Sequence, residues 1–280
     1  MFNDLTDNKS RGVLVAIGGA EDKTSEAVIL RRVLGLAPDP SACEVGVIAT
    51  ASGYPDETFA TYDETFGRLG AKAVHNLDVR TRADAGRPEL IEAIERCNVI
   101  FLTGGDQLRL THILGGSPLL AAIRQRREQG AVIAGTSAGA AAMSATMIYN
   151  GHAADALRKG AVKMSSGLAF VHGVIIDSHF LERGRFTRLM EVGTTNPEYL
   201  GIGIGEDAGV IIHEGPILEA IGNGHVIIVD SSELRVSNVF ELSDGEPVAV
   251  EHVIMHALTS GFGYDVRKRR FLSPSDLENN

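Results

Sequence analysis

Short apolar runs alternate along this chain with longer stretches in which apolar residues recur at helical spacing. In the first half the apolar runs are 13–17, 45–49, 73–77, 99–102 and 131–134, and the clearest helical stretches are 24–36 and 57–69. Each run ends at a turn that is rich in glycine or polar residues. Continuous apolar strands that alternate with amphipathic helices are typical of a parallel sheet covered on both faces, so the pattern predicts an α/β fold.

The pattern changes after about residue 200. The apolar runs 210–212, 217–221 and 226–229 follow one another with only short glycine-containing turns between them. Such spacing favours antiparallel strands that close one side of the domain. Because the chain shows no linker, repeat or low-complexity segment, we predict a single α/β domain over residues 1–280, with flexible tails at 1–10 and 272–280.

Composition narrows the class of protein without identifying it. A chain of 280 residues can bury a large core without disulfides, and its 44% apolar and 22% charged residues are ordinary for a globular protein. It has no apolar run of membrane-spanning length, and its first residues are polar and acidic, unlike a signal peptide. We therefore expect a cytoplasmic protein with no membrane partner. Cys43 and Cys97 are far apart and lie beside apolar stretches, which favours buried free thiols.

The net charge of −10 argues against a nucleic-acid partner and is compatible with a cationic substrate. An acidic protein without any charged ligand would have the same balance. A nucleotide site is not favoured either, because Gly18 and Gly19 are not part of a complete G-x-G-x-x-G sequence.

A serine sits at a sharp turn directly behind the run 131–134. The segment 135–139 reads Gly-Thr-Ser-Ala-Gly and leads into an alanine-rich helical stretch. At such a nucleophile elbow the serine adopts a strained backbone with an exposed hydroxyl, and small neighbours let the turn close. The free N–H groups at the start of the helix can hold an oxyanion. The turn therefore predicts Ser137 as a nucleophile, although a glycine-rich turn that only packs well would look similar.

Further polar turns follow other predicted strands. They comprise residues 18–22, 104–107, 177–179 and 206–207. Since parallel strands end at one edge of a sheet, these turns and Ser137 are expected to meet there. Several independent polar turns at one edge are more than packing requires, which favours a catalytic site.

A serine hydroxyl needs a base, usually a histidine held by a carboxylate. Of the nine histidines, His179 has the best position, after a strand end and before a basic helix. His152 lies in the polar stretch 150–166, which we interpret as an active-site loop. Core, surface or late-strand roles are favoured for His75, His172, His213, His225, His252 and His256.

The residues themselves leave three candidates for the orienting acid. Glu206 and Asp207 follow a strand whose glycines allow close approach, and Asp177 would share a face with His179 in an extended segment. An α/β-hydrolase order of nucleophile, acid and base would instead need an acid such as Asp230 and a late histidine. The surroundings of His252 read as a strand rather than a loop, which disfavours that order.

Five segments, in this order and spacing, resemble the cyanophycinase family of serine peptidases, whose group also contains aspartyl dipeptidase. They are residues 17–23, 103–107, 135–140, 177–180 and 201–207, and the resemblance extends from residue 11 to about 235. It implies a three-layer α/β/α fold like that of the class I glutamine amidotransferases, usually as a homodimer. It implies Ser137 as nucleophile, His179 as base and Glu206 as orienting acid, with no metal or organic cofactor. The implied oxyanion donors are the backbone N–H groups of Gly105 and Ala138.

The resemblance also implies a substrate. Cyanophycin is a polyaspartate whose side chains carry arginine through isopeptide bonds, and the family acts as an exopeptidase that releases β-aspartyl-arginine. The residues implied at the substrate are Gln107, Asp177, Arg183, Arg185 and Arg188. Gln107 would support the nucleophile, and the arginines would bind substrate carboxylates through their guanidinium forks. Ser178 departs from the family, which commonly has glutamine there.

Two alternatives remain at this point. An aspartyl dipeptidase acting on short Asp-X peptides would share the serine turn but would not need the arginine cluster. A catalytically silent relative would only bind a peptide or partner, which the joint presence of Ser137, His179 and Glu206 disfavours.

Overall fold

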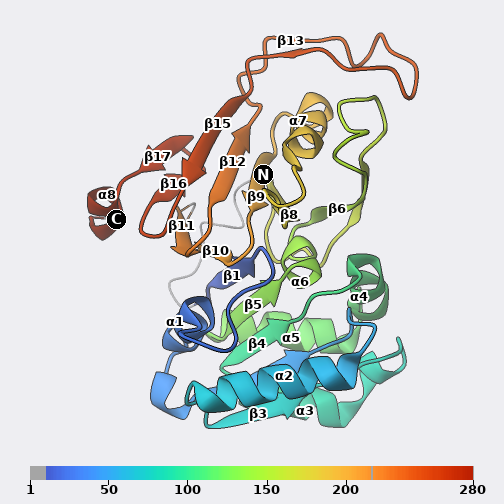
Figure 1. Ribbon diagram of the computed structural model, residues 1–280. Helices are drawn as coiled ribbons and strands as arrows, with labels where there is room; N and C mark the ends of the chain where they lie inside the picture. The colour runs from blue at the N-terminus through green and yellow to red at the C-terminus, as the bar shows by residue number, and fades with distance from the viewer. Residues whose placement is uncertain (1–10, 216, 280) are drawn as a thin grey trace.

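The computed structural model describes residues 11–215 and 217–279 and is built around a nine-stranded sheet (Figure 1). Five of its strands are parallel and neighbour one another in the order β1, β5, β4, β2, β3. Their bounds are Leu14–Ile17, Val132–Thr136, Val99–Leu102, Glu44–Ile48 and Ala73–Asn76. These are the five apolar runs of the first half, so the predicted α/β fold with a parallel central sheet is confirmed.

The late strands divide between two sheets. Antiparallel strands β10, β11, β16 and β17 extend the first sheet beyond β1, with bounds Ala208–Ile212, Ile217–Gly222, Gly263–Asp265 and Arg270–Leu272. A second sheet has the order β15, β12, β9, β8, with bounds Ile254–Leu258, Val226–Asp230, Leu200–Ile204 and Val174–Ser178. The predicted strand at 226–229 therefore leaves the first sheet and pairs with β9.

Two short ribbons complete the strands. β6 (Thr146–Asn150) pairs with β7 (Lys163–Ser166), and β13 (Val236–Ser237) pairs with β14 (Val250–Glu251). The stretch that we interpreted as a loop at 150–166 is therefore the connection between β6 and β7 together with β7 itself.

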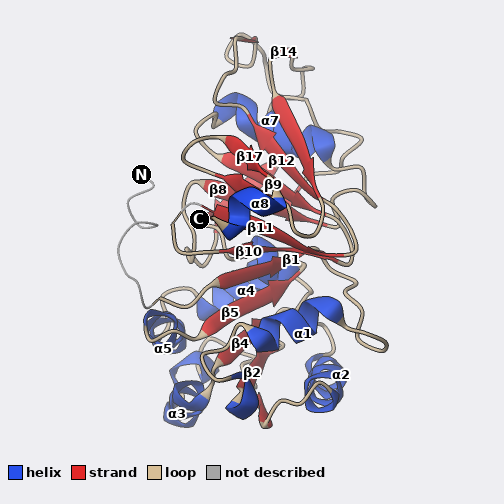
Figure 2. Cartoon of the chain, turned by 90° about the vertical axis from the view of Figure 1, so that its left-hand side faces the viewer, coloured by secondary structure: helices blue, strands red, loops and turns tan. Residues whose placement is uncertain are grey.

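Helices cover both faces of the parallel strands (Figure 2). α1 (Val28–Gly35) and α2 (Pro55–Arg68) lie on one side, and α3 (Pro88–Arg96) and α5 (Pro118–Glu128) lie on the other. Because alternate residues of a strand point to opposite faces, Val15 packs with the first pair of helices and Leu14 with the second. Burial on both faces explains why the strand sequences are continuously apolar.

The remaining helices are α4 (Gln107–Leu114), α6 (Ala138–Ala141), α7 (Phe186–Thr195) and α8 (Pro274–Glu278). None of the helices in the described part of the chain has the length and apolar character that a bilayer crossing requires.

The first helix begins later than the pattern 24–36 predicted. The carboxylate of Asp22 accepts hydrogen bonds from the backbone N–H groups of Thr24, Ser25 and Ala27, and Ala27 has a φ of 47°. These bonds hold the segment as a turn until α1 starts at Val28. They also lower the pKa of Asp22 below its usual range, with the Ser25 hydroxyl as the largest cause.

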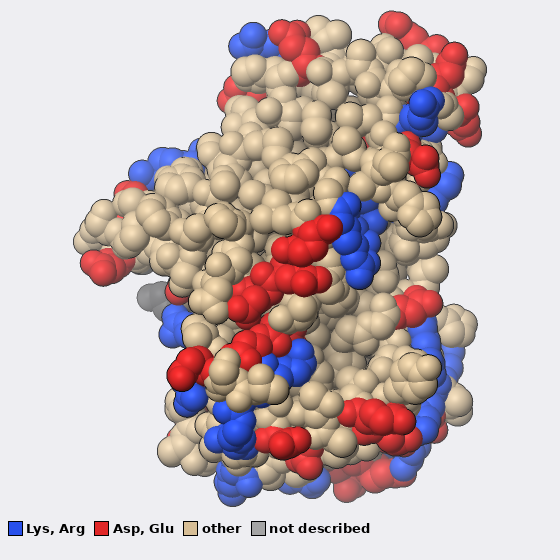
Figure 3. Space-filling view, in the orientation of Figure 1, with Lys and Arg blue, Asp and Glu red and all other residues tan. Residues whose placement is uncertain are grey.

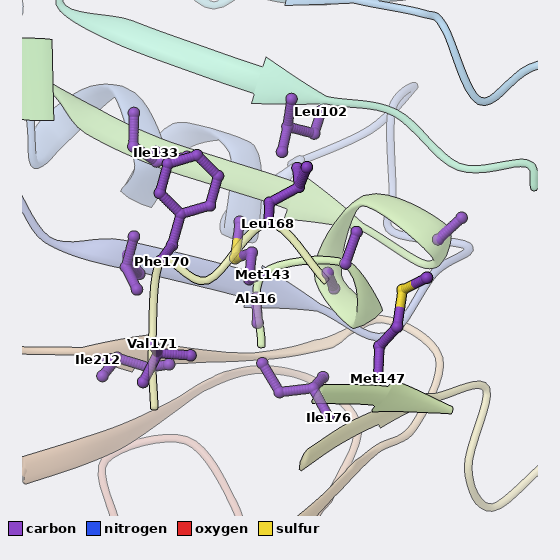
Figure 4. Close-up of a cluster of buried hydrophobic side chains, with 14 of the residues drawn as sticks. Ala16, Leu102, Ile133, Met143, Met147, Leu168, Phe170, Val171, Ile176 and Ile212 are labelled. Atoms are coloured by element: carbon purple, nitrogen blue, oxygen red, sulfur yellow. The ribbon is translucent and has the colours of Figure 1, made fainter. Parts of the chain in front are cut away.

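A common core joins the two sheets beneath the serine turn. Figure 4 shows Met143 and Phe170 between the side chain of Ile133 on β5 and that of Ile176 on β8. All four side chains belong to one buried cluster. The strands that lead to the predicted nucleophile and base, Ser137 after β5 and His179 after β8, are therefore fixed relative to each other by packing.

The C-terminal segment carries more secondary structure than a flexible tail would. β17 ends at Leu272, and Ser273 then caps α8 in a capping box with Asp276. The expectation for residues 1–10 and 280 lies outside the described residues, and the single-domain assignment stays a prediction.

Both cysteines are buried and unpaired, as predicted. Burial raises the pKa of the Cys43 thiol to about 11 and that of Cys97 to about 12. Thiols of this kind are unreactive at neutral pH.

Candidate active site

Ser137 occupies a strained backbone conformation between β5 and α6, with φ 51° and ψ −110°. Such a conformation costs a non-glycine residue roughly 1–3 kcal/mol, so the surrounding structure has to impose it. The flanking glycines allow the required approach. A Cβ on Gly135 would lie 2.7 Å from the backbone of Gly139, and one on Gly139 would lie 2.2 Å from the carbonyl oxygen of Leu102.

Three side chains form a continuous hydrogen-bonded chain. The Ser137 Oγ lies 2.9 Å from Nε2 of His179, and the His179 Nδ1 lies 2.7 Å from Oε1 of Glu206. A carboxylate only accepts hydrogen bonds, so Nδ1 is the donor in this pair, and in the neutral form of the ring Nε2 can accept from the serine hydroxyl. The structure thus brings together the nucleophile and base candidates and selects Glu206 from the three acids.

The other two acids have different partners. Asp207 accepts hydrogen bonds from the backbone N–H of Asp22 at 3.1 Å and from the side-chain amide of Asn223 at 2.8 Å. Asp177 is 3% exposed and forms ion pairs with Arg185 and Arg188. Neither carboxylate therefore holds the imidazole.

The turn after β1 determines where the imidazole of His179 can lie. The His179 backbone has a φ of 47°, and its N–H donates to the carbonyl oxygen of Gly18 at 2.9 Å. A Cβ on Gly19, whose φ is 109°, would lie 2.4 Å from Cε1 of the ring. Only glycine at this position leaves room for the imidazole.

Gly19→Ala is therefore expected to lower kcat by about a hundredfold, because the methyl group pushes the imidazole out of line with Ser137. Steady-state kinetics with circular dichroism measure this effect. Gly67→Ala is the matched control, because an added Cβ on this α2 residue meets no atom within 4 Å. Equal kinetics for both variants would contradict the assigned position of His179.

The predicted oxyanion donors lie at two neighbouring strand ends. Ala138 is the first residue of α6, so its N–H has no acceptor within the helix. Gly105 has a φ of 139°, and a Cβ there would lie 2.0 Å from the carbonyl oxygen of Ala51. Gly104 brings this turn against the nucleophile, since its Cβ would lie 3.3 Å from that of Ser137.

The three arginines after His179 have different surroundings. Arg185 and Arg188 each lie 3.1 Å from the carboxylate of Asp177, whereas Arg183 is exposed. Arg188 is 4% exposed and also donates to the carbonyl oxygen of Gly151 at 2.9 Å. Burial raises the pKa of Asp177 against the opposing charge of Arg188, and burial lowers the pKa of both paired arginines. Asp177 thus holds two guanidinium groups in place.

Two cavities lie in this region. One of about 390 Å³ is lined by the three arginines together with Gln107, Tyr149, Asn150, Gly151, His152 and Ala153. Gln107 donates from Nε2 to the carbonyl oxygen of Ile148 at 3.1 Å. The other cavity, of about 360 Å³, is lined by Ser137 and His179 themselves and by residues of the β1 turn and α2. Of the five predicted substrate residues, Gln107 and the three arginines line the first cavity together with His152 and the start of the predicted loop. Asp177 does not line it, because its buried carboxylate is paired with Arg185 and Arg188.

Sequence reasoning missed a buried carboxylate beside the nucleophile. Glu21 is 3% exposed, and its carboxylate accepts hydrogen bonds from the hydroxyls of Tyr62 at 2.5 Å and Thr136 at 2.7 Å. Lys23 lies 3.0 Å from the same group. Burial, with the nearby charge of Glu21, raises the pKa of Tyr62. The one signal in the sequence was an acid two residues after a glycine pair at a strand end.

Comparisons with known proteins identify the family of this chain. Residues 13–219 match peptidase family S51. A cyanophycinase from Geminocystis herdmanii is 38% identical over 256 residues, which cover 91% of this chain and 94% of that protein. A cyanophycinase from Trichormus variabilis is 36% identical over 268 residues, which cover 95% of this chain and 90% of that protein.

Solved structures resemble the fold. A crystal structure of a peptidase from an acI-B1 Actinobacterium superposes with a TM-score of 0.66 at 21% identity and covers 91% of this chain and 97% of its own. A putative peptidase E protein from Listeria monocytogenes EGD-e reaches 0.53 at 16% identity, covering 76% of this chain and 100% of its own. With the family match spanning the segments that carry Ser137, His179 and Glu206, this chain belongs to peptidase family S51.

Proposed function

We propose that this protein is a serine-type exopeptidase that hydrolyses main-chain bonds of cyanophycin and releases β-aspartyl-arginine dipeptides. The observation that carries the proposal is the chain of two hydrogen bonds from Ser137 through His179 to Glu206. Relatives named cyanophycinase, 36–38% identical over most of the chain, support the substrate.

In the proposed reaction Ser137 attacks the substrate carbonyl carbon while its hydroxyl proton passes to Nε2 of His179. Glu206 stabilises the imidazolium that forms, and the N–H groups of Gly105 and Ala138 bind the oxyanion. The carbon–nitrogen bond then breaks as His179 gives its proton to the departing amine, leaving an ester on Ser137. Water attacks this ester, gives a proton to His179, and the serine oxygen leaves with that proton.

The arginine-lined cavity is the proposed site for the free α-carboxylate of a substrate arginine. Arg183 is exposed and able to contact it directly, while Asp177 orients Arg185 and Arg188 toward the hollow. A guanidinium fork matches a carboxylate geometrically, which suits this role. Gln107 lines the same cavity and is proposed to contact the bound substrate.

Each unit of the polymer carries a guanidinium group as well as a carboxylate. Figure 3 shows acidic side chains across the middle of one face with basic side chains next to them. A surface with both signs of charge close together suits a substrate with both signs in each repeat.

Ser178 is 6% exposed, and its carbonyl oxygen accepts from Arg185 at 2.7 Å. At the position where the family commonly has glutamine, this chain therefore contacts Arg185 through the backbone carbonyl of Ser178.

The alternative is a dipeptidase that acts on short Asp-X peptides. The deciding experiment incubates the protein with cyanophycin granules and, separately, with Asp-Leu, and identifies products by mass spectrometry. We expect β-aspartyl-arginine from the polymer and little turnover of Asp-Leu. If Asp-Leu were hydrolysed rapidly and cyanophycin were left uncleaved, the dipeptidase alternative would replace the proposal. If the protein turns over neither substrate and a serine-directed reagent does not label Ser137, the result would point to a silent binding protein.

Arg183→Gln tests the carboxylate site separately. We expect KM for the polymer to rise about tenfold with a smaller change in kcat, because an exposed charge-assisted contact to bound substrate is lost. Arg31→Gln removes an exposed arginine on α1 and serves as the control. Unchanged kinetics for Arg183→Gln would remove this residue from the substrate site.

For the finer description of the fold we propose a three-layer α/β/α arrangement of the class I glutamine amidotransferase type, with Ser137 at a nucleophile elbow. Helices on both faces of the parallel strands support this assignment. A homodimer and a cytoplasmic location stay predictions.

A further inference from the structure

The carbonyl groups of three successive residues, at the end of β1 and in the turn that follows it, each accept a hydrogen bond from a different part of the proposed triad. The N–H of Ser137 donates to the oxygen of Ile17 at 2.9 Å, and the N–H of His179 donates to Gly18 at 2.9 Å. The N–H of Asp207, the residue next to Glu206, donates to Gly19 at 3.0 Å. One short turn therefore touches the backbone at or beside the nucleophile, the base and the acid.

The carboxylate of Glu21 ties the end of this turn to the serine turn. One oxygen accepts from the hydroxyl of Thr136, the residue before Ser137, at 2.7 Å. The other accepts from the hydroxyl of Tyr62 on α2 and lies 3.0 Å from the ammonium group of Lys23. A carboxylate that is so deeply buried requires all of these partners, so its position is narrowly defined.

We infer that the turn 17–21, anchored by the Glu21 carboxylate through Thr136, is a positioning element that holds the three triad residues in mutual register. The inference rests on the proposed catalytic triad. Glu21 acts through Thr136 and is a positioning residue, since the contacts of its carboxylate are to other protein groups rather than to the reacting hydroxyl.

The strained backbone of Ser137 gives this tether its importance. A residue held at φ 51° and ψ −110° relaxes unless its neighbours are fixed on both sides. Helix α6 fixes the side that follows Ser137, while the Thr136 hydroxyl bond and the β5 ladder fix the side that precedes it. Loss of the tether would let the Ser137 hydroxyl drift from the imidazole, while the arginine-lined cavity, which neither Glu21 nor Thr136 lines, would stay unchanged.

Thr136→Val tests the tether, because valine keeps the shape of threonine and replaces the hydroxyl by a methyl group that cannot donate to Glu21. We expect kcat for the polymer and the second-order rate of Ser137 labelling by a fluorophosphonate to fall by about 10–100-fold, with KM nearly unchanged. Thr136→Ser keeps a hydroxyl and should restore most of both rates.

Thr194→Val is the matched control. Thr194 on α7 is as buried as Thr136, at 4% exposed, and its hydroxyl donates at 2.6 Å to the carbonyl oxygen of Glu191 in the same helix rather than to a residue of the triad or of the turn 17–21. Both variants should unfold at similar temperatures, and only Thr136→Val should lose labelling rate. Equal labelling rates for the two variants, or a loss that follows the unfolding temperature alone, would overturn the inference.

Glu21→Ala supplies an independent arm. If Glu21→Ala folds, it should slow labelling at least as much as Thr136→Val. Adding Thr136→Val to it should lower the labelling rate little further, because both substitutions remove the same hydrogen bond between Thr136 and Glu21. Fully additive losses would contradict the tether. If Glu21→Ala does not fold, the comparison of Thr136→Val with Thr194→Val and Thr136→Ser still tests the inference. Absence of labelling in the unmodified protein would instead refute the proposed triad, which separates that failure from failure of the inference.

Discussion

Replacing Ser137 by alanine is expected to lower kcat for cyanophycin by at least about a thousandfold while the fold and polymer binding persist. The substitution removes the attacking oxygen, so no acyl-enzyme can form. Release of β-aspartyl-arginine, followed by mass spectrometry, measures the loss, and thermal unfolding reports the fold. Removing the hydroxyl also removes one partner of His179 without leaving a buried charge, so we expect little change in stability.

Ser144→Ala is the control for this prediction. Ser144 is fully buried shortly after the serine turn, and its hydroxyl has no hydrogen-bond partner among the described residues. Its removal should leave kcat within about twofold of the unmodified protein, in the range of ordinary substitutions away from the site. Substantial dipeptide release by Ser137→Ala would reject Ser137 as the nucleophile and, with it, the acyl-enzyme route.

His179→Ala is expected to cost nearly as much as Ser137→Ala, because the hydroxyl then has no group to take its proton. Effects of groups that act as a unit are strongly non-additive, so the double variant should be about as slow as either single one. Single-turnover kinetics on the polymer should place the defect in acyl-enzyme formation, and fluorophosphonate labelling of Ser137 should slow in parallel.

The chain offers a close match for this histidine. His213 lies 2.7 Å from Glu219, the same separation as His179 from Glu206, but no serine is among its hydrogen-bond partners in the described part of the chain. His213→Ala should therefore remove a comparable histidine–carboxylate hydrogen bond and leave the reaction unchanged. If His179→Ala retained the labelling rate of His213→Ala, the proposed base would have to be sought elsewhere.

Several features followed from the order of residues alone. The five apolar runs of the first half became β1 to β5, because strands buried on both faces have to be continuously apolar. The small residues around Ser137 predicted a tight turn, because only glycine lets neighbouring backbone segments come as close as they do at positions 135 and 139. The strand ends then predicted where polar turns would meet, since parallel strands finish at one edge.

Other features depended on contacts between distant segments. Periodicity placed the run 226–229 among the closing strands but did not determine its partner, which is β9 in a second sheet. The start of α1 was misplaced because the side chain of Asp22 competes with the helix for backbone N–H groups. Neither choice is visible in hydrophobic spacing, which reports the face that a residue presents and not the neighbour that it meets.

The site divides in the same way. The sequence by itself determined the chemical kinds present at the sheet edge: a strained serine, a histidine, several acids and a group of arginines. Only the tertiary structure decided that Glu206 is the acid hydrogen-bonded to His179, that Asp177 is paired with Arg185 and Arg188, and that Glu21 accepts a hydrogen bond from Thr136. The physical reason is that a hydrogen bond between side chains requires an approach within about 3 Å, which the packing of sheets and helices sets and chain spacing does not.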